Sequence, residues 1–259
     1  MFSKDVGLSG PPLVASTRAV TAIDRGNAAL MAERPNLERK YVFHAGQAHM
    51  LGVWLSATLA PDPAFAVGQV SSLYFDTPQL HLYHEKRNSD FLKTKVRLRW
   101  YDRPASAVDP VTCYLEIKKK IGAIRSKERV EVPVPPHVLR DRLFTDPAIL
   151  DAPGMADPSL RARALVPLLV VQYQRSRFVD PITGARVALD TEICVRQANP
   201  QFLPHVHPVM LPLGVLETKG VDRQLPATLE ALALHFRRET FSKYAVCCEH
   251  VMSPHGRRL

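Results

Sequence analysis

The clearest pattern of hydrophobic and polar positions lies in residues 91–102, which read FLKTKVRLRWYD. Basic residues occupy every second position from Lys93 to Arg99, and apolar residues such as Val96 and Leu98 lie between them. Successive side chains of a β-strand point to opposite faces, so this segment as a strand has one cationic face and one mostly apolar face. A helix would scatter the same residues around its surface. The pattern predicts a strand, and taken alone it fits an edge strand whose basic residues point to solvent.

Similar segments along the rest of the chain predict further strands and helices. The expected strands are residues 37–43, 69–76, 111–119, 127–134, 168–178 and 185–192, with another within 209–219. The expected helices are residues 47–59, 136–144, 158–165, 227–238 and 242–252, with a short turn or helix at 81–87. Residues 1–35 are expected to form a flexible leader, residues 36–252 one domain and residues 253–259 a tail. Locally joined strands with interspersed helices indicate an α+β fold built on an antiparallel sheet.

A charged face recurs on these strands, and it carries both signs. The residues that share such a face are Glu38 and Lys40; Lys93, Lys95, Arg97 and Arg99; Glu116, Lys118 and Lys120; Lys127, Arg129 and Glu131; Tyr173, Arg175 and Arg177; Arg186, Asp190 and Glu192; and Glu217 and Lys219. A closed antiparallel barrel would place these side chains in its lumen and the apolar faces outside, under the helices. Such a lumen tolerates its like charges only if it is wet and holds an anion, with carboxylates placed for cations. The pattern therefore predicts a site for phosphate groups and a divalent metal ion.

Two other interpretations of the charged faces stay open. A sheet with one solvated charged face explains the alternation without any ligand. A basic sheet that binds nucleic acid is the second, but carboxylates such as Glu38 and Glu116 lie on the same faces and would repel a phosphate backbone. Few aromatic residues are interleaved with the basic ones, which also disfavours nucleic acid.

Composition narrows the possible partners. Lys plus Arg number 34 against 25 Asp plus Glu, giving a formal charge of +9, which suggests a polyanionic partner. The four cysteines lack CxxC spacing, so we expect neither a zinc site nor a disulfide framework, and a reducing cytoplasm fits best. No apolar run approaches the roughly 20 residues of a membrane span, and the N-terminus has no secretory signal pattern. No Walker A motif or kinase-type glycine loop is present, which argues against an ordinary nucleotide-binding fold.

Nine short motifs, in order, resemble the catalytic domain of the vacuolar transporter chaperone (VTC) family of polyphosphate polymerases, within the triphosphate tunnel metalloenzyme (CYTH-like) superfamily. They are residues 38–41 (ERKY), 72–78 (SLYFDTP), 97–101 (RLRWY), 115–118 (LEIK), 127–129 (KER), 173–175 (YQR), 186–190 (RVALD), 216–219 (LETK) and 242–244 (SKY). Related CYTH phosphatases open with an ExExK strand, and Asn36 in place of the first acid favours the VTC branch.

The resemblance implies a tunnel whose basic lumen holds a chain of phosphates. The residues that it places against phosphate are Lys40, Arg97, Arg99, Lys118, Lys127, Arg175, Arg186 and Lys243, with Tyr173 beside them and with Lys219 and Ser242 in the same catalytic set. It makes Glu217 a ligand of Mn²⁺ or Mg²⁺ and adds Glu38, Glu116 and Asp190 as further acidic contributors.

The function expected from the resemblance is transfer of the γ-phosphoryl group of ATP onto a growing polyphosphate chain, assisted by a divalent metal. A phosphohydrolase that cleaves inorganic triphosphate or a nucleoside triphosphate would use much the same residues and stays open as an alternative. A non-catalytic module that binds polyphosphate is the third possibility. Nucleic acid is not expected as a partner.

Overall fold

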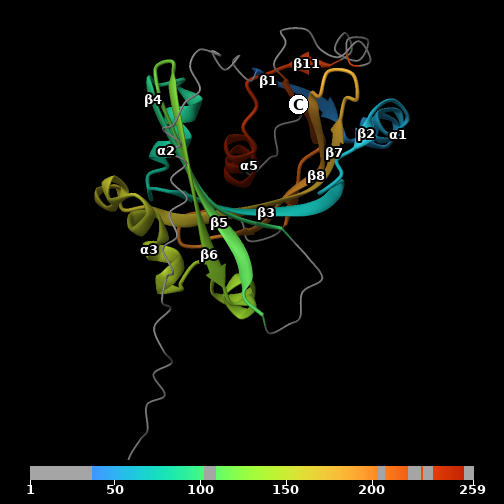
Figure 1. The fold of residues 1–259 in the computed structure, drawn as a ribbon. Coiled ribbons are helices and arrows are strands. Elements are labelled where there is room, and N and C mark those ends of the chain that lie inside the picture. Colours follow the sequence, from blue (N-terminus) through green and yellow to red (C-terminus); the bar gives the residue numbers. More distant parts are fainter. Residues whose placement is uncertain (1–36, 102–108, 204–207, 221–228, 230–235, 254–259) are drawn as a thin grey trace, which may run out of the picture.

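The computed structural model describes residues 37–101, 109–203, 208–220, 229 and 236–253. These residues form one antiparallel sheet with the strand order β11-β1-β10-β8-β7-β3-β4-β5-β6, and two short strands, β2 and β9, pair with β7 and β8 (Figure 1). The strands are β1 Leu37–His44, β2 Ala60–Pro61, β3 Val67–Asp76, β4 Leu92–Tyr101, β5 Val111–Ile121, β6 Ile124–Val134, β7 Val166–Val179, β8 Arg186–Ala198, β9 Val209–Met210, β10 Leu213–Gly220 and β11 Arg237–Arg238. The α+β class and the antiparallel sheet are confirmed.

The helical elements are short and follow the strands closely. They are η1 Ala45–Gln47, α1 Ala48–Thr58, α2 His81–Arg87, the π-helical η2 Val138–Arg142, α3 Pro147–Ala156, η3 Pro158–Arg163 and α5 Lys243–Met252. None of them, within the described part of the chain, is long and apolar enough to cross a membrane. The predicted leader, most of the predicted tail and most of the predicted helix over residues 227–238 lie outside the described residues.

Strand β4 lies in the interior of the sheet, between β3 and β5, so it is not the edge strand that its alternation, taken alone, would also fit. Its two faces do differ as the alternation predicts. Val96 and Leu98 are buried on the convex side of the curved sheet, in a core that includes Ile149 of α3. Arg97 and Arg99 point to the concave side, where they contact tyrosines of β3 and β7. The alternation therefore reports the two faces of a curved central strand.

The sheet curls strongly, but it is not closed, so the prediction of a closed barrel is wrong. The strand order of the sheet ends at β6 on one side and at β11 on the other. No pairing between these two edge strands occurs among the described residues. Residues 124–129 of β6 are all exposed. Charged residues such as Lys127 and Arg129, followed by Pro133, give β6 the character of an edge strand, because charge and proline disfavour pairing with a further strand.

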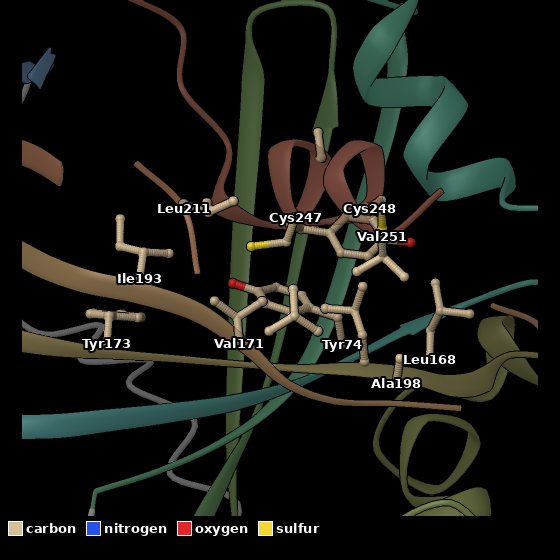
Figure 2. Close-up of a cluster of buried hydrophobic side chains, with 14 of the residues drawn as sticks. Tyr74, Leu168, Val171, Tyr173, Ile193, Ala198, Leu211, Cys247, Cys248 and Val251 are labelled. Carbon is tan, nitrogen blue, oxygen red and sulfur yellow. The ribbon is translucent and has the colours of Figure 1, made fainter. Parts of the chain in front are cut away.

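Helix α5 lies within the curl of the sheet, whereas α1 and α3 cover its convex side (Figure 1). Tyr244, Cys247 and Val251 of α5 are buried against β3, β7 and β8 (Figure 2). The Tyr244 ring stacks on Tyr74 with centroids 5.0 Å apart. The expected arrangement of helices outside the sheet is therefore correct for α1 and wrong for α5, and α3, which was not predicted, also lies outside. The concave side is filled by α5 and by the charged side chains described below.

The turn between β3 and α2 is held by one buried carboxylate. Asp76 accepts hydrogen bonds from the backbone N–H groups of Thr77, Leu82 and Tyr83, and from the hydroxyl of Tyr244 in α5. A buried carboxylate is tolerated when its oxygens are bonded in this way. Asp76 thus fixes the position of α5, which also carries a residue of the charged site.

Candidate functional site

The concave face brings together charged side chains from strands that are far apart in the sequence, and we call this group the charged cluster. From one end of the sheet to the other, its members are Glu38 and Lys40 of β1, Glu217 and Lys219 of β10, Asp190 of β8, Tyr173 and Arg175 of β7, Lys95, Arg97 and Arg99 of β4, Glu116 and Lys118 of β5, Lys127 of β6, and Lys243 of α5. The alternation within each strand aligns them, and the curvature of the sheet makes them converge.

Glu116 of β5 joins cations of the two strands that flank it, β4 and β6. Its carboxylate accepts from Nε of Arg97 at 2.7 Å, lies 3.1 Å from Nζ of Lys127, and is 3.9 Å from Nη1 of Arg99. Burial alone would raise the pKa of Glu116, but Arg97 and Arg99 outweigh it and hold that pKa well below its usual range. Glu116 is therefore an ionised counter-ion whose oxygens are already engaged by cations.

Asp190 plays the same part on the other side of the concave face. Its side chain is fully buried, accepts from Nε and Nη2 of Arg175 at 2.6 and 2.7 Å, and also contacts Nζ of Lys243. Burial would raise its pKa, but Lys243 and Arg175 lower it well below the usual range. The bidentate contact orients the Arg175 guanidinium, and Lys243 ties α5 to β8.

Two Glu–Lys pairs on β1 and β10 form a third group. Nζ of Lys40 lies 2.7 Å from Glu38, Nζ of Lys219 lies 2.7 Å from Glu217, and the strand register places Lys40 beside Glu217. Burial would raise the pKa of Glu217, but Lys219, Lys40 and Arg175 lower it to about 2. Nη2 of Arg175 lies 4.0 Å from Glu217, so this guanidinium connects the group to Asp190.

Hydroxyl groups position the arginines of β4. Nε of Arg99 donates to Oγ of Ser72 and its Nη2 donates to Oη of Tyr173, both at 3.1 Å. Nη1 of Arg97 donates to Oη of Tyr74 at 3.3 Å. Since neutral hydroxyls fix Arg99 without cancelling its charge, this guanidinium keeps its capacity for an anionic ligand.

Lys95 is a member of the cluster that the resemblance did not single out, although the alternation placed it on this face. Its Nζ lies 5.0 Å from the centroid of the Tyr74 ring. Burial lowers its pKa well below the usual value, and the nearby charges of Arg97, Lys40 and Lys118 lower it further. Solvent reaches Lys118, yet the surrounding protein and Arg97 lower its pKa to about 8. The lowered pKa values show that burial and the surrounding cations disfavour positive charge at these two amines, which a bound anion would relieve.

Two residues of the predicted set occupy less central positions. Arg186 is exposed at the start of β8, where it lies beside Lys219 in the strand register. Oγ of Ser242 accepts from the backbone N–H of Ala245 and caps the N-terminus of α5. Ser242 therefore positions the helix that carries Lys243.

A divalent metal fits this site only when a bound phosphate ligand supplies part of its coordination. No group of three His, Cys, Asp or Glu side chains converges on a metal position within the described residues. Two or more cations contact Glu116 and Asp190 closely, whereas Glu38 and Glu217 lie on adjacent strands and each has one lysine within 2.7 Å, with Arg175 at 4.0 Å from Glu217. Mg²⁺ is often held by one or two carboxylates plus phosphate oxygens and water. Glu217 and Glu38 are therefore the residues that would hold the metal, and Mn²⁺ or Mg²⁺ suits their oxygen donors.

A model of the VTC domain matches residues 36–142 and 154–252, which is most of the chain. The chain belongs to the VTC domain family. This match spans the charged cluster from Glu38 to Lys243 and includes every strand that carries it. The family suggested by the nine sequence motifs is thereby confirmed.

Comparisons with solved structures return more distant similarities to this VTC domain. A putative adenylate cyclase from Bacillus halodurans shares 14% identity over 72% of this chain and 81% of its own, with a TM-score of 0.43. A putative adenylate cyclase from Vibrio parahaemolyticus shares 17% identity over 80% and 94% of the two chains, with a TM-score of 0.39. A conserved hypothetical protein from Pyrococcus furiosus shares 9% identity over 76% and 83%, with a TM-score of 0.34. A search of curated proteins returned no match.

Proposed function

We propose that the concave face of this VTC domain binds a chain of phosphoryl groups and that the protein is a metal-dependent polyphosphate polymerase. The observation that carries the proposal is the convergence of arginines and lysines from β1, β4, β5, β6, β7, β10 and α5 on one face. Among the described residues, Lys95 and Arg99 lack a close carboxylate partner of their own, because the contacts of Arg99 are mainly to hydroxyls. A polyanion would neutralise this excess positive charge.

The proposed reaction moves the γ-phosphoryl group of ATP to the end of a polyphosphate chain. The bond from the γ-phosphorus to the β,γ-bridging oxygen breaks, a terminal oxygen of the chain forms the new bond, and ADP leaves. Such transfers depend on positioning and on charge neutralisation more than on covalent catalysis by the protein. A bound Mg²⁺ or Mn²⁺ would neutralise charge on the phosphate oxygens.

The residues of the chain have distinct parts in this proposal. Arg97 and Arg175, oriented by Glu116 and Asp190, present fixed guanidinium groups to phosphate oxygens. Lysines such as Lys40, Lys127 and Lys243 act as adaptable point charges at the margins of the same face. The carboxylates keep these cations in place until phosphate binds.

The test is to identify the products formed from ATP in the presence of Mn²⁺ or Mg²⁺. Long polyphosphate chains on a gel, with stoichiometric ADP, are expected for a polymerase. Free phosphate or pyrophosphate without chains would instead show a phosphohydrolase, and tight triphosphate binding without turnover would show a non-catalytic module. Arg99→Ala and the exposed Arg140→Ala, on η2, serve as the disabled and matched control variants.

Replacing Arg99 by alanine is expected to weaken triphosphate binding by about 1.5–3 kcal/mol, the range for losing a charge-assisted hydrogen bond. The fold should persist, because Arg99 lies as far as 3.9 Å from the nearest carboxylate, that of Glu116. Glu116 would still be paired with Arg97 and Lys127 in the variant. Titration calorimetry with inorganic triphosphate measures the change. An affinity equal to that of Arg140→Ala would remove Arg99 from the binding site.

Triphosphate binding is expected to take up protons through Lys95 at pH values below the ordinary lysine pKa of 10.5. The pKa of Lys95 in the free protein is lowered by burial and by the cations around it, so the amine loses its proton well below pH 10.5. A bound polyanion favours the charged form and raises that pKa again. Affinity should therefore fall as the pH rises, and calorimetry in buffers of different ionisation enthalpy should show proton uptake. Lys95→Arg, which stays charged, should reduce the uptake, and unchanged uptake in that variant would contradict the assignment.

A further inference from the structure

The tip of the β5–β6 hairpin and the turn before β4 expose a group of large apolar side chains. Phe91 is 73% exposed, Leu92 43%, Ile121 48% and Ile124 74%. Single exposed apolar residues are common on protein surfaces, whereas a contiguous group marks an interaction site. These four residues are contiguous, because Leu92 pairs with Ile121 and Ile121 pairs with Ile124 across three neighbouring strands.

The backbone of the turn at Gly122 places the Phe91 ring next to the end of the β5–β6 hairpin. Gly122 has a φ of +58°, and its N–H donates to the carbonyl of Phe91 at 2.9 Å. A Cβ at Gly122 would lie 2.7 Å from the Phe91 ring, so the absence of a side chain there lets the ring lie over the turn. The Phe91 ring therefore lies over the turn that joins Ile121 to Ile124, although most of its surface faces solvent. We call Phe91, Leu92, Ile121 and Ile124 the apolar tip.

A row of basic residues flanks the apolar tip on the opposite, concave face of the same three strands, because neighbouring positions of a strand point to opposite faces. Lys93 pairs with Lys120, and Lys120 pairs with Arg125, one position further along the same three strands. Lys86 of α2 is close to this row, since the charges of Lys93 and Lys120 contribute to the lowering of its pKa. Asp90, just before the tip, is acidic. The four basic residues named here outnumber it, so the local charge remains positive.

We propose that the apolar tip and the basic row that flanks it form a docking surface for an anionic lipid membrane. Apolar side chains that protrude from a basic surface can enter the boundary between headgroups and acyl chains while the cations contact the headgroups. An aromatic ring such as that of Phe91 suits this boundary. Each basic residue near the surface of an anionic leaflet adds to the attraction, which decreases as salt screens it.

Charge complementarity favours a membrane over a second copy of the chain. Two copies that met end to end through their hairpin tips would bring Lys93, Lys120 and Arg125 of each copy near one another, and like charges would repel. A soluble phosphate chain would use the basic row but would leave Phe91, Ile121 and Ile124 exposed to water. An anionic membrane that meets the hairpin end-on can take up the apolar side chains while its headgroups contact the basic row on the other face.

The test is cosedimentation of the full chain with vesicles. Vesicles of phosphatidylcholine containing about 30 mol% phosphatidylserine should bind the protein, pure phosphatidylcholine should bind it at least about tenfold more weakly, and added salt should release it. Saturating inorganic triphosphate should leave most of the binding intact, because the apolar tip lies outside the charged cluster. Loss of binding under triphosphate would mean that lipid phosphates occupy the cluster, and this would overturn the proposal.

Matched substitutions locate the contact. The double variant Ile121→Ser with Ile124→Ser should lose at least about tenfold in vesicle affinity, because insertion of apolar surface drives this kind of binding. Val53→Ser, which removes a 58% exposed apolar residue from α1, should bind as the unchanged protein does. Both variants should keep their melting temperatures, since the side chains are exposed. Equal vesicle binding by both variants, absence of vesicle binding, or a concentration-dependent dimer abolished by the double variant would each refute membrane docking at this tip.

Discussion

Replacing Asp190 by alanine is expected to lower the free energy of unfolding by about 3–5 kcal/mol, the range for removing one partner of a buried ion pair. Asp190 is fully buried, and its two oxygens bind Arg175 and Lys243. Its loss leaves two cations on the concave face without their closest counter-ion and unties α5 from β8. Urea unfolding measures the change. Asp151→Ala, an exposed site on α3, is the matched control and should change stability by less than about 0.5 kcal/mol.

The pH dependence of the same variant checks the cause. The pKa of Asp190 in the folded protein is below its ordinary value of 3.8, so the ion pairs stabilise the fold fully above that value. This contribution is lost as the pH falls through 3.8 toward the lower folded value, where the carboxylate takes up a proton. Asp190→Ala should therefore lose less stability than the unchanged protein between neutral and strongly acidic pH. An equal loss in both would show that Asp190 does not supply this stability.

Glu217→Gln is expected to bind triphosphate but to lose roughly 100-fold or more of turnover with Mg²⁺ or Mn²⁺, the scale of removing one electrostatic contact to a transition state. A hard divalent cation requires oxygen ligands, and an amide supplies a much weaker one than a carboxylate. The cations that would hold triphosphate, including Lys219 and Arg175, remain in place. Turnover and calorimetric affinity are measured together.

A role for Glu217 as a counter-ion alone predicts different values of stability, triphosphate affinity and turnover. If Glu217 served only as a counter-ion for Lys219 and Lys40, the amide would unpair these lysines, lower stability and strengthen triphosphate binding, with turnover largely kept. Glu131→Gln, on the exposed part of β6, is the matched control and should leave turnover and affinity unchanged. Near-normal turnover of Glu217→Gln with either metal would exclude Glu217 from the metal site.

Alternation of residue types predicted the faces of the strands well, because the two-residue period of a strand is encoded locally. It failed at β8, where Glu192 was expected on the face of Asp190. A bulge with Glu192 at a φ of +52° shifts the register, so Glu192 is exposed and Ile193 enters the concave core. Nothing in the local alternation marks the extra residue.

Closure of the sheet and the place of α5 depend on contacts between distant segments, which the sequence pattern does not contain. The helix expected over residues 242–252 is present as α5, but the sequence pattern did not indicate which side of the sheet it covers. Helix α3 was not predicted, because Pro147 and Pro153 suggested a loop. Pro147 is in fact compatible with a helix start, following Asp146 as the N-cap.

The candidate site was predictable as a list of residues but not as a set of pairs. Strand faces and the family motifs selected Arg97, Arg175 and Glu217, yet they did not show that Glu116 and Asp190 are engaged by cations whereas Glu217 is less constrained. Lys95 was placed on the charged face but not in the site. The cations around Lys95 come from β1, β4 and β5, so only the register between these strands reveals them.

The position of α5 inside the curl of the sheet determines when the concave face can assemble during synthesis of the chain. A nascent chain that has emerged only through β8 has already exposed Arg97, Arg99 and Arg175, but β1 still lacks its partner β10, and the concave core still lacks Tyr244 and Val251. These long-range contacts form late, because chain closure across such separations is slow. The assembled charged cluster arises only once α5 has left the ribosome and inserted.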